Sequence, residues 1–529
     1  MSGAEVRDTR ACRIPAPEPG GPRPDRVPRV AVVGGGVAGL AAATCLAERR
    51  VEVVVLEREP SLGGRLRGWE TTLADGSTAT MSRGFHAFFR QYYNLRALLR
   101  RADPGLSSFV QLQDYPLVHR AGHADRFSGL PTTPPWNAFA LAATSRSFPV
   151  RQLAGVNVPA TLQLLDVQLP EVHERLGHRS ARELLDLARF PGDARHLAFE
   201  VFSRSFFSAP EQLSAAEMAV MFHLYFLGSS EGLRFDVPRS PFPRALWDPW
   251  ETRLSELGTA VHTGASVCGV EPLGGPGYSV SWECGTIPRE EVFDGVVLAT
   301  DPASLPALVE RSPSLGTPEW RERATGVRTA PPFLVSRYWL DRPVRGHRQA
   351  FLGTGGHPTL DNISVLDRYE DEAARWAART GGSVVELHAY ALPQGCSEEA
   401  ERDHLWRQAV SVYPELDGAV AVDSRHELRA DCPLFPPGGH VRRCGITTPD
   451  PGLVMAGDHV RVDLPVALME RAATSGILAA NTLLGGWGER GHPVWSAPLR
   501  GRHAPSRALA RASRGSGPGS GRRADDRSR

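Results

Sequence analysis

The sequence contains no lysine, so all 60 residues counted as Lys or Arg are arginine. Without lysine the chain can form neither a Schiff base nor the phosphate-binding lysine of a P-loop, which excludes two large classes of enzyme. The 60 basic residues are balanced by 59 acidic ones, leaving a net charge of +1. No overall basic field would attract nucleic acid, and we expect no nucleic-acid partner.

Cysteine is also scarce, with seven residues that never occur in a C-x-x-C spacing. This usage is typical of reduced thiols in a cytoplasmic protein, and the lack of clustered Cys and His predicts no metal site. No apolar run approaches the roughly 20 residues that cross a bilayer. The N-terminus lacks the apolar core of a signal peptide. We therefore expect a cytoplasmic protein without a membrane span.

Both ends of the chain have few apolar residues. Residues 1–28 are rich in proline, and residues 488–529 alternate Ser, Gly, Pro and Arg without an apolar period. Such segments bury too little apolar surface to offset the entropy lost on ordering. The sequence therefore predicts a disordered N-terminal arm and a disordered basic tail.

The segment between these ends begins with a strand, a turn, a helix and a second strand. The strands are predicted at Arg29–Gly34 and Val51–Glu57, and the helix at Val37–Arg49. Continuous β-branched strands of this kind are typical of a parallel sheet covered on both faces. We therefore expect a doubly wound α/β sheet to begin here.

The turn between the first strand and the helix carries the pattern GxGxxG. Gly34 permits the tight turn, Gly36 lets the backbone approach a pyrophosphate, and Gly39 lets helix and strand pack closely. Glu57 ends the second strand, where a carboxylate accepts hydrogen bonds from the ribose hydroxyls of a dinucleotide. Together these residues predict a dinucleotide site.

The residues that follow distinguish FAD from NAD. The pattern ExxxxxGGR from Glu57 to Arg65 resembles the signature of the flavin amine oxidase and carotene desaturase superfamily. The resemblance implies that Gly64 and Arg65 lie against FAD. It also implies further contacts from Val267, in a strand after Gly264, and from Gly457 and Asp458 after a late apolar strand. The implied fold is a Rossmann-like FAD-binding domain of the GR2 type with an interleaved α+β substrate domain.

Because these motifs span some 420 residues, each domain must be assembled from separate segments. The predicted parts of the FAD-binding domain are 29–105, 251–305 and 441–487, and those of the substrate domain are 106–250 and 306–440.

The substrate class is indicated by the segment Met81–Leu95, which resembles the carotenoid φ-ring synthases, or isorenieratene synthases. Further stretches support this resemblance: Phe206–Phe207, Ser214–Phe235, Cys432–Gly438 and Asp463–Ala472. The resemblance implies a β-carotene desaturase/methyltransferase that aromatises the end ring of β-carotene or γ-carotene. The methyl group moves within the ring by a 1,2-shift, so no methyl donor is required. A quinone or oxygen would reoxidise the flavin.

Such a shift proceeds through a cation, which favours a dry site with aromatic or negative faces. We expect Asp463 to stabilise the cation or remove a proton, although it could instead cap a helix ahead of Pro465. We expect His86 to lie near the flavin and relay a proton, although it could be a structural histidine. The helix predicted from Ser214 to Leu227, with Glu217 in capping-box spacing, is apolar almost all round and must be buried or line a cavity.

A carotenoid must reach the enzyme from a membrane, so we expect peripheral attachment. The segment Pro131–Pro170, with Trp136, Phe139, Phe148 and Leu153, could lie at the interface or form a lid over the core. Three alternatives stay open: an acyclic carotene desaturase or isomerase, a flavin-free lipid carrier like the Rab GDP-dissociation inhibitors, and an amine oxidase.

Overall fold

The computed structural model describes residues 6–145, 155–164, 166–189 and 206–515. The predicted strand, helix and strand form as β2 (Arg29–Val33), α1 (Val37–Ala47) and β3 (Glu52–Glu57). They begin a five-stranded parallel sheet in the order β11-β3-β2-β15-β21. Its other strands are β11 (Ala260–Thr263), β15 (Gly295–Leu298) and β21 (Leu453–Met455).

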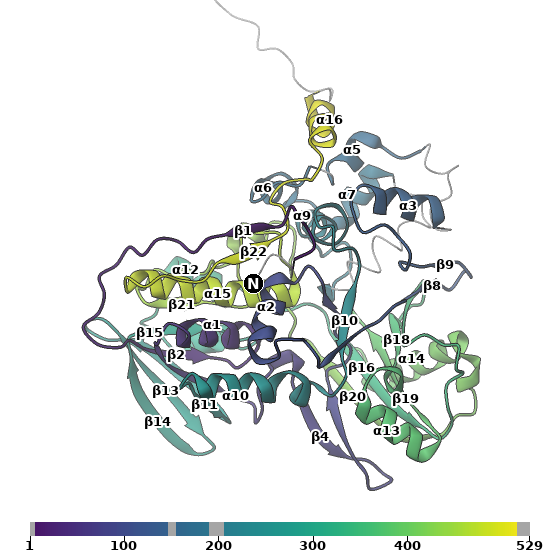
Figure 1. Ribbon diagram of the computed structural model, residues 1–529, viewed down its shortest axis with the longest axis horizontal. Coiled ribbons are helices and arrows are strands. Elements are labelled where there is room, and N and C mark those ends of the chain that lie inside the picture. The colour runs from purple at the N-terminus through teal and green to yellow at the C-terminus, as the bar shows by residue number, and fades with distance from the viewer. Residues whose placement is uncertain (1–5, 146–154, 165, 190–205, 516–529) are drawn as a thin grey trace, which may run out of the picture.

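The two faces of this sheet are covered by different layers, because alternate residues of β2 point to opposite sides. Val30 and Val32 belong to a core with the helices α1, α15 (Leu468–Gly486) and α10 (Asp248–Glu256). Ala31 and Val33 belong to a second core. Its elements are β12 (Ala265–Pro272), β13 (Tyr278–Cys284), β14 (Ile287–Phe293), α11 (Leu305–Glu310) and α12 (Pro318–Thr325). The chain thus has an α/β fold around a Rossmann-like sheet (Figure 1).

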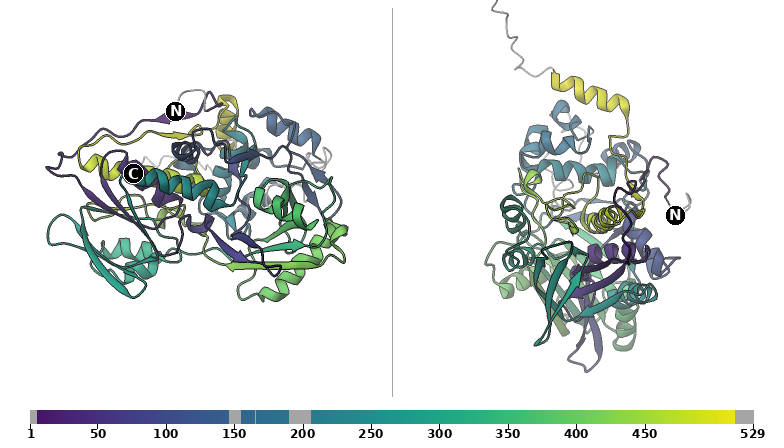
Figure 2. Two further views of the ribbon diagram at one scale, coloured as in Figure 1. Left: turned by 60° about the horizontal axis from the view of Figure 1, so that its bottom comes forward. Right: turned by 90° about the vertical axis from the view of Figure 1, so that its left-hand side faces the viewer.

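A second sheet of seven strands stands beside the first, in the order β20-β16-β19-β18-β17-β8-β9. Its strands are β8 (Leu117–His119), β9 (Ala124–Asp125), β16 (Phe333–Leu340), β17 (Phe351–Gly355), β18 (Asn362–Val365), β19 (Ser383–Ala389) and β20 (Ala421–Arg429). The helices α13 (Asp371–Thr380) and α14 (Glu398–Val412) pack on it. Figure 2 shows this sheet and its helices at one end of the molecule and the β12–β14 layer at the other.

Smaller sheets join these parts. They are formed by β4 (Gly68–Thr72) with β5 (Thr78–Ser82), and by β6 (Phe88–Phe89), β7 (Phe109–Gln111) and β10 (Phe235–Pro238). The helix α2 (Tyr93–Ala102) packs against α15. Short 3-10 or π-helical turns lie at Gly64–Leu66, His223–Leu227, Pro243–Trp247, Leu366–Arg368, Pro414–Leu416 and His440–Arg442.

A helical lobe lies above both sheets in the view of Figure 1. It contains α3 (Trp136–Thr144), α5 (Val158–Leu162), α6 (Glu171–Leu176), α7 (Ala181–Ala188), α9 (Ala215–Phe222) and α16 (Ala504–Gly515). Within the described part of the chain, none of the helices combines the length and apolar character that crossing a membrane requires.

The two chain ends pair with each other, so the prediction that they are disordered is wrong for residues 6–28 and 488–515. The strand β1 (Cys12–Ile14) pairs antiparallel with β22 (Val494–Ser496). Buried Asp8 accepts two hydrogen bonds of 2.8 Å from Arg502. Each segment alone has too little apolar surface to fold, but each supplies the other's backbone partners. Residues 1–5 and 516–529 lie outside the described range.

The buried helix predicted from Ser214 forms as α9 and continues as the π-helical turn His223–Leu227. Ser214 caps it by accepting from the backbone of Ala216. The predicted capping box is wrong, because the Glu217 carboxylate turns inward and pairs with Arg443 and Arg471 at 2.7 Å each.

Candidate active site

A cleft opens at the carboxyl ends of the parallel strands, where the turn after β2 meets the loop after β21. The empty space in it amounts to about 1350 Å³. Eight of the nine predicted cofactor residues line this cleft: Gly34, Gly36, Glu57, Gly64, Arg65, Val267, Gly457 and Asp458. The motifs that lie far apart in the sequence therefore meet at one site.

The glycines of the turn have separate roles. Gly34 has a φ of 112°, and a Cβ there would lie 2.6 Å from the carbonyl oxygen of Ala299. Gly39 does not line the cleft; a Cβ on it would lie 1.9 Å from the carbonyl oxygen of Gly34, so it serves the close packing of helix and strand. Gly36 is the N-cap of α1 and has no side chain that could accept hydrogen bonds from the first backbone N–H groups of the helix. The first turn of α1 is thus left to bind an anion in the cleft.

Glu57 holds the turn from the neighbouring strand. Its Oε2 accepts a hydrogen bond from the backbone of Gly35 at 2.6 Å, and its Oε1 accepts one from Glu59 at 2.8 Å. Burial raises the pKa of this carboxyl, while the two backbone donors lower it. Glu57 is in position for the ribose contact that the sequence predicts.

Arg65 and Asp458 pair with each other in the lining of the cleft. Nη2 of Arg65 donates to Oδ1 of Asp458 at 2.6 Å. Burial alone would lower the pKa of Arg65, but the Asp458 carboxylate outweighs it and raises the pKa. Behind them, the backbone N–H of Gly457 donates to the Ser475 hydroxyl at 2.9 Å, which ties the loop to α15.

The residues of the cleft fit FAD by their chemistry. Half-buried Thr300 lines the cleft, and its buried Oγ1 has no hydrogen-bond partner among the described residues. Arg83 forms an ion pair with Asp431, and both line the cleft although sequence reasoning did not single them out. Arg83 lies in the motif Met81–Leu95 and Asp431 directly precedes Cys432–Gly438, so the quoted motifs were the available signal.

A second cavity adjoins the cleft, and Leu468 and Met469 at the start of α15 line both. Its empty space is about 1110 Å³. Its lining is rich in aromatic residues: Phe85, Tyr115, Phe127, Phe207, Phe235, Phe351 and Tyr390. Phe85 stacks on Phe351 with ring centroids 4.3 Å apart. We call this space the aromatic cavity.

His86 lines the aromatic cavity and is partly buried. Its Nδ1 lies 2.9 Å from the carbonyl oxygen of Gly84, and because a carbonyl only accepts, Nδ1 carries the proton. Burial lowers the pKa of His86 to about 4. A neutral imidazole with this pKa is a weak base, so its position suits the predicted role better than its basicity does.

Asp463 lines neither cavity, so the structure does not bring it to the place that the sequence predicts. Its side chain is 54% exposed, and its Oδ1 lies 3.9 Å from Nε2 of His440. It is not a helix cap either, because α15 begins at Leu468 with Ala467 as its N-cap. Among the described residues that line the aromatic cavity, Asp361 supplies the carboxylate instead.

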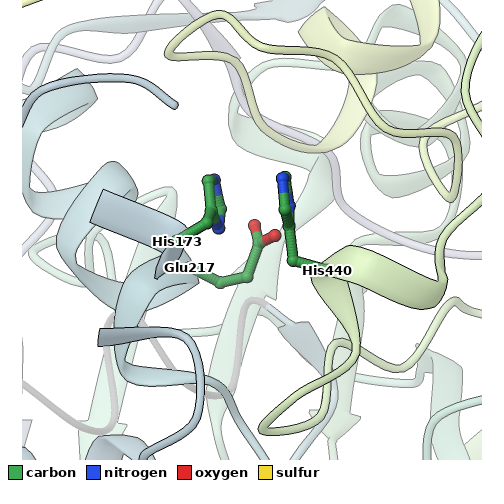
Figure 3. A group of neighbouring side chains, drawn as sticks. All are labelled: His173, Glu217 and His440. Atoms are coloured by element: carbon green, nitrogen blue, oxygen red, sulfur yellow. The ribbon is translucent and has the colours of Figure 1, made fainter. Parts of the chain in front are cut away.

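The neighbour of Asp463, His440, belongs to a cluster of polar side chains with His173 and Glu217 (Figure 3). His173, Glu217 and His440 bring potential ligand atoms within 4.8 Å of one another. However, Glu217 is already paired with Arg443 and Arg471. The rings of His173 and His440 stack 3.6 Å apart at 6°, so their nitrogen lone pairs lie in separate parallel planes that no single ion can share. The cluster is arranged as an ion-pair network.

Comparisons with known proteins show the family and the fold of the chain. Residues 37–484 match the family model described as flavin containing amine oxidoreductase. The chain is 56% identical to a carotenoid phi-ring synthase from Streptomyces griseus, over 95% of this chain and 97% of that protein. It is 27% identical to a carotenoid phi-ring synthase from Chlorobaculum tepidum, over 89% and 91%. Among solved structures, putrescine oxidase bearing cofactor-site mutations has a TM-score of 0.62 at 16% identity, over 87% of this chain and 100% of that one.

Proposed function

Because the chain belongs to the family of flavin containing amine oxidoreductases, we propose that it is an FAD-dependent desaturase that aromatises the β-ring of β-carotene or γ-carotene with an intramolecular methyl shift. The observation that carries this proposal is the meeting of the FAD cleft and the aromatic cavity at Leu468 and Met469. The relatives named carotenoid phi-ring synthase support the same reaction.

The proposed reaction removes four hydrogens from each ring, two as hydride and two as protons. FAD, when bound, supplies the two-electron oxidation. Gly36, Glu57, Arg65 and Asp458 hold the cofactor, and a quinone or oxygen takes up the electrons after each oxidation.

The aromatic cavity suits the cation that precedes the methyl shift. Aromatic faces attract a positive charge, and exclusion of water protects the cation from capture. Asp361, which is 7% exposed, adds a negative charge to the lining. We assign to Asp361 the cation-stabilising role that the sequence favoured for Asp463.

The substrate would enter from a membrane surface, to which the protein binds peripherally from the cytoplasm. Trp136 and Phe139 on α3 are each 64% exposed, with ring centroids 6.3 Å apart. They belong to the segment that the sequence predicts for this role, whereas Phe148 and Leu153 lie outside the described residues. Large exposed aromatic side chains of this kind favour a lipid interface.

The deciding experiment incubates the flavin-loaded protein with β-carotene and a quinone, and analyses the pigment by mass and proton NMR spectra. We expect a product that lacks four hydrogens for each ring processed and carries trimethylphenyl signals. A longer polyene would indicate the acyclic desaturase, and a flavin-free preparation the lipid carrier. Unchanged carotenoid together with consumption of an amine would indicate an amine oxidase and overturn the proposal.

A further inference from the structure

A series of hydrogen-bonded side chains runs from the interior of the seven-stranded sheet to the aromatic cavity. We call this series the relay. It consists of Glu386, His388 and Tyr390, spaced two residues apart along and just beyond β19. Side chains at this spacing lie on one face of a strand. Glu386 and His388 are each 1% exposed, whereas Tyr390 lines the cavity. The site described above gives Tyr390 only a place in the cavity lining and uses neither Glu386 nor His388.

The contacts show which atom donates each hydrogen bond of the relay. Oε1 of Glu386 lies 2.8 Å from Nε2 of His388, and Nδ1 of His388 lies 2.7 Å from the Tyr390 hydroxyl. An ionised carboxylate only accepts, so Nε2 carries the proton, and Nδ1 is left to accept from Tyr390. The phenol oxygen of Tyr390 therefore presents its remaining lone pair to its surroundings.

Cross-strand neighbours keep Glu386 ionised and Tyr390 oriented. Arg337, opposite Glu386 in the β16–β19 register, donates to Oε2 of Glu386 through Nε at 2.9 Å and Nη2 at 2.7 Å. Burial opposes ionisation of Glu386, but Arg337 and His388 together outweigh it and lower the pKa of the carboxyl to about 2. Asn362, opposite His388 in the β18–β19 register, donates to the Tyr390 oxygen at 3.2 Å.

We propose that Tyr390 is the catalytic base that removes a ring proton in the aromatisation, with His388 and Glu386 as positioning residues that receive and balance the charge. This inference rests on the proposed function. A ring C–H bond breaks and its electron pair becomes the ring double bond. The proton passes to the oxygen of Tyr390 as the hydroxyl proton of Tyr390 passes to Nδ1 of His388. The positive charge of the substrate thereby moves to the imidazole, beside the Glu386 carboxylate.

His86, the histidine that lines the aromatic cavity, is less suited to this step. His86 donates through Nδ1 to a backbone carbonyl rather than to a carboxylate. A proton taken up by His86 would therefore lack the carboxylate partner that His388 has. Glu386 also lines a smaller cavity together with Glu370 and Ser240.

The test compares Tyr390→Phe with Tyr115→Phe in the flavin-loaded enzyme. Both tyrosines line the aromatic cavity, but the Tyr115 hydroxyl donates to the carbonyl of Leu233 and joins no relay. Anaerobic bleaching of the flavin by the carotenoid reports hydride removal, and pigment analysis reports ring aromatisation. For Tyr390→Phe we expect the rate of flavin bleaching to stay within threefold of wild type and the rate of aromatic product formation to fall at least 50-fold. A non-aromatic dehydro pigment should accumulate. In Tyr115→Phe, the rate of flavin bleaching and the rate of aromatic product formation should change by the same factor.

A second variant guards against a folding defect. His388→Gln keeps a hydrogen-bonding side chain but cannot become a cation, and we expect the same split between bleaching and aromatisation. The relay is overturned if Tyr390→Phe forms aromatic product within threefold of the wild-type rate. It is also overturned if Tyr390→Phe and Tyr115→Phe lose aromatic product to the same extent. If His86→Gln alone produces the split, His86 is the base and the relay is wrong. A wild-type enzyme whose flavin no carotenoid bleaches overturns the proposed function, and the relay with it.

Discussion

Arg65 and Asp458, which both line the FAD cleft, are joined by a hydrogen bond of 2.6 Å across 393 positions of sequence. The contact links the loop after β3 to the loop after β21 and so fixes the two segments relative to each other. Its two side chains are 26% and 8% exposed.

We expect Arg65→Ala to reduce FAD retention at least tenfold, because it removes a cation from the cleft and leaves the Asp458 carboxylate buried without its partner. Arg65→Lys should retain little more FAD than Arg65→Ala, since an ammonium group lacks the planar arrangement of donors of a guanidinium. The ratio of flavin to protein absorbance after gel filtration measures retention. Arg58→Ala is the control, because Arg58 lines the same cleft but its side chain is 51% exposed. Equal flavin content in all variants would contradict this role of Arg65.

A substitution at Asp361 tests the charge in the aromatic cavity. Asp361→Asn keeps the shape and can still accept the hydrogen bond of 2.6 Å from the backbone of Tyr390. Loss of the negative charge should lower the rate of aromatic product formation by about 100-fold, the usual size for one electrostatic contact to a transition state. Carotenoid affinity, measured by quenching of protein fluorescence, should change less than threefold. An unaltered product rate would show that the charge of Asp361 does not act on the cation.

The sequence predicts the parts of the site that depend on neighbouring residues better than the parts that depend on contacts between distant segments. The turn at Gly34 and the position of Glu57 follow from local backbone requirements, and the structure places both at the cleft. Asp463 was chosen because it is near Asp458 in sequence, but the chain turns it outward before α15 begins. The cavity position of Asp361 depends on the register between β18 and β19, which no local pattern fixes.

The sequence contains a pattern from which the relay could be predicted. In the stretch from Val385 to Tyr390, Glu386, His388 and Tyr390 alternate with apolar residues, so that polar side chains share one face of a strand. The pairing of the chain ends had no such signal, because each end provides what the other lacks.

Glu470 predicts a pH dependence of stability. Its carboxyl, 1% exposed, accepts hydrogen bonds from the backbones of Asn94 and Leu95 at the start of α2, at 2.9 and 3.0 Å. Burial outweighs these donors and raises its pKa from 4.5 to about 8. Between these values the unfolded chain has released the proton while the folded chain retains it, so the stability contributed by this group falls as pH rises.

The loss from Glu470 between pH 4.5 and 8 should be on the order of a few kcal/mol, given about 1.4 kcal/mol for each unit of pKa difference. Glu470→Gln cannot titrate, so the melting temperature of the wild type minus that of the variant should decline from pH 5 to pH 8 and level off above it. Differential scanning fluorimetry across this range measures the difference. A difference that is constant or rises with pH would mean that the folded protein holds Glu470 ionised.

Membrane attachment is tested at α3. Replacing both Trp136 and Phe139 with serine removes two rings that are each 64% exposed, and should weaken binding to vesicles of phosphatidylcholine and phosphatidylglycerol about tenfold, since less apolar surface enters the lipid. Sedimentation with the vesicles measures the bound fraction.

The matched control is the pair Ile287→Ser and Val292→Ser on β14. These side chains are 60% and 56% exposed, but they lie on the antiparallel layer away from the helical lobe (Figure 1). If both double variants lose vesicle binding equally, the attachment is a general effect of surface apolarity rather than of α3. If only the α3 variant loses binding while detergent-solubilised carotenoid is still turned over at the wild-type rate, α3 serves delivery of the substrate and not the chemistry. That separation follows from the structure, because neither Trp136 nor Phe139 lines the aromatic cavity.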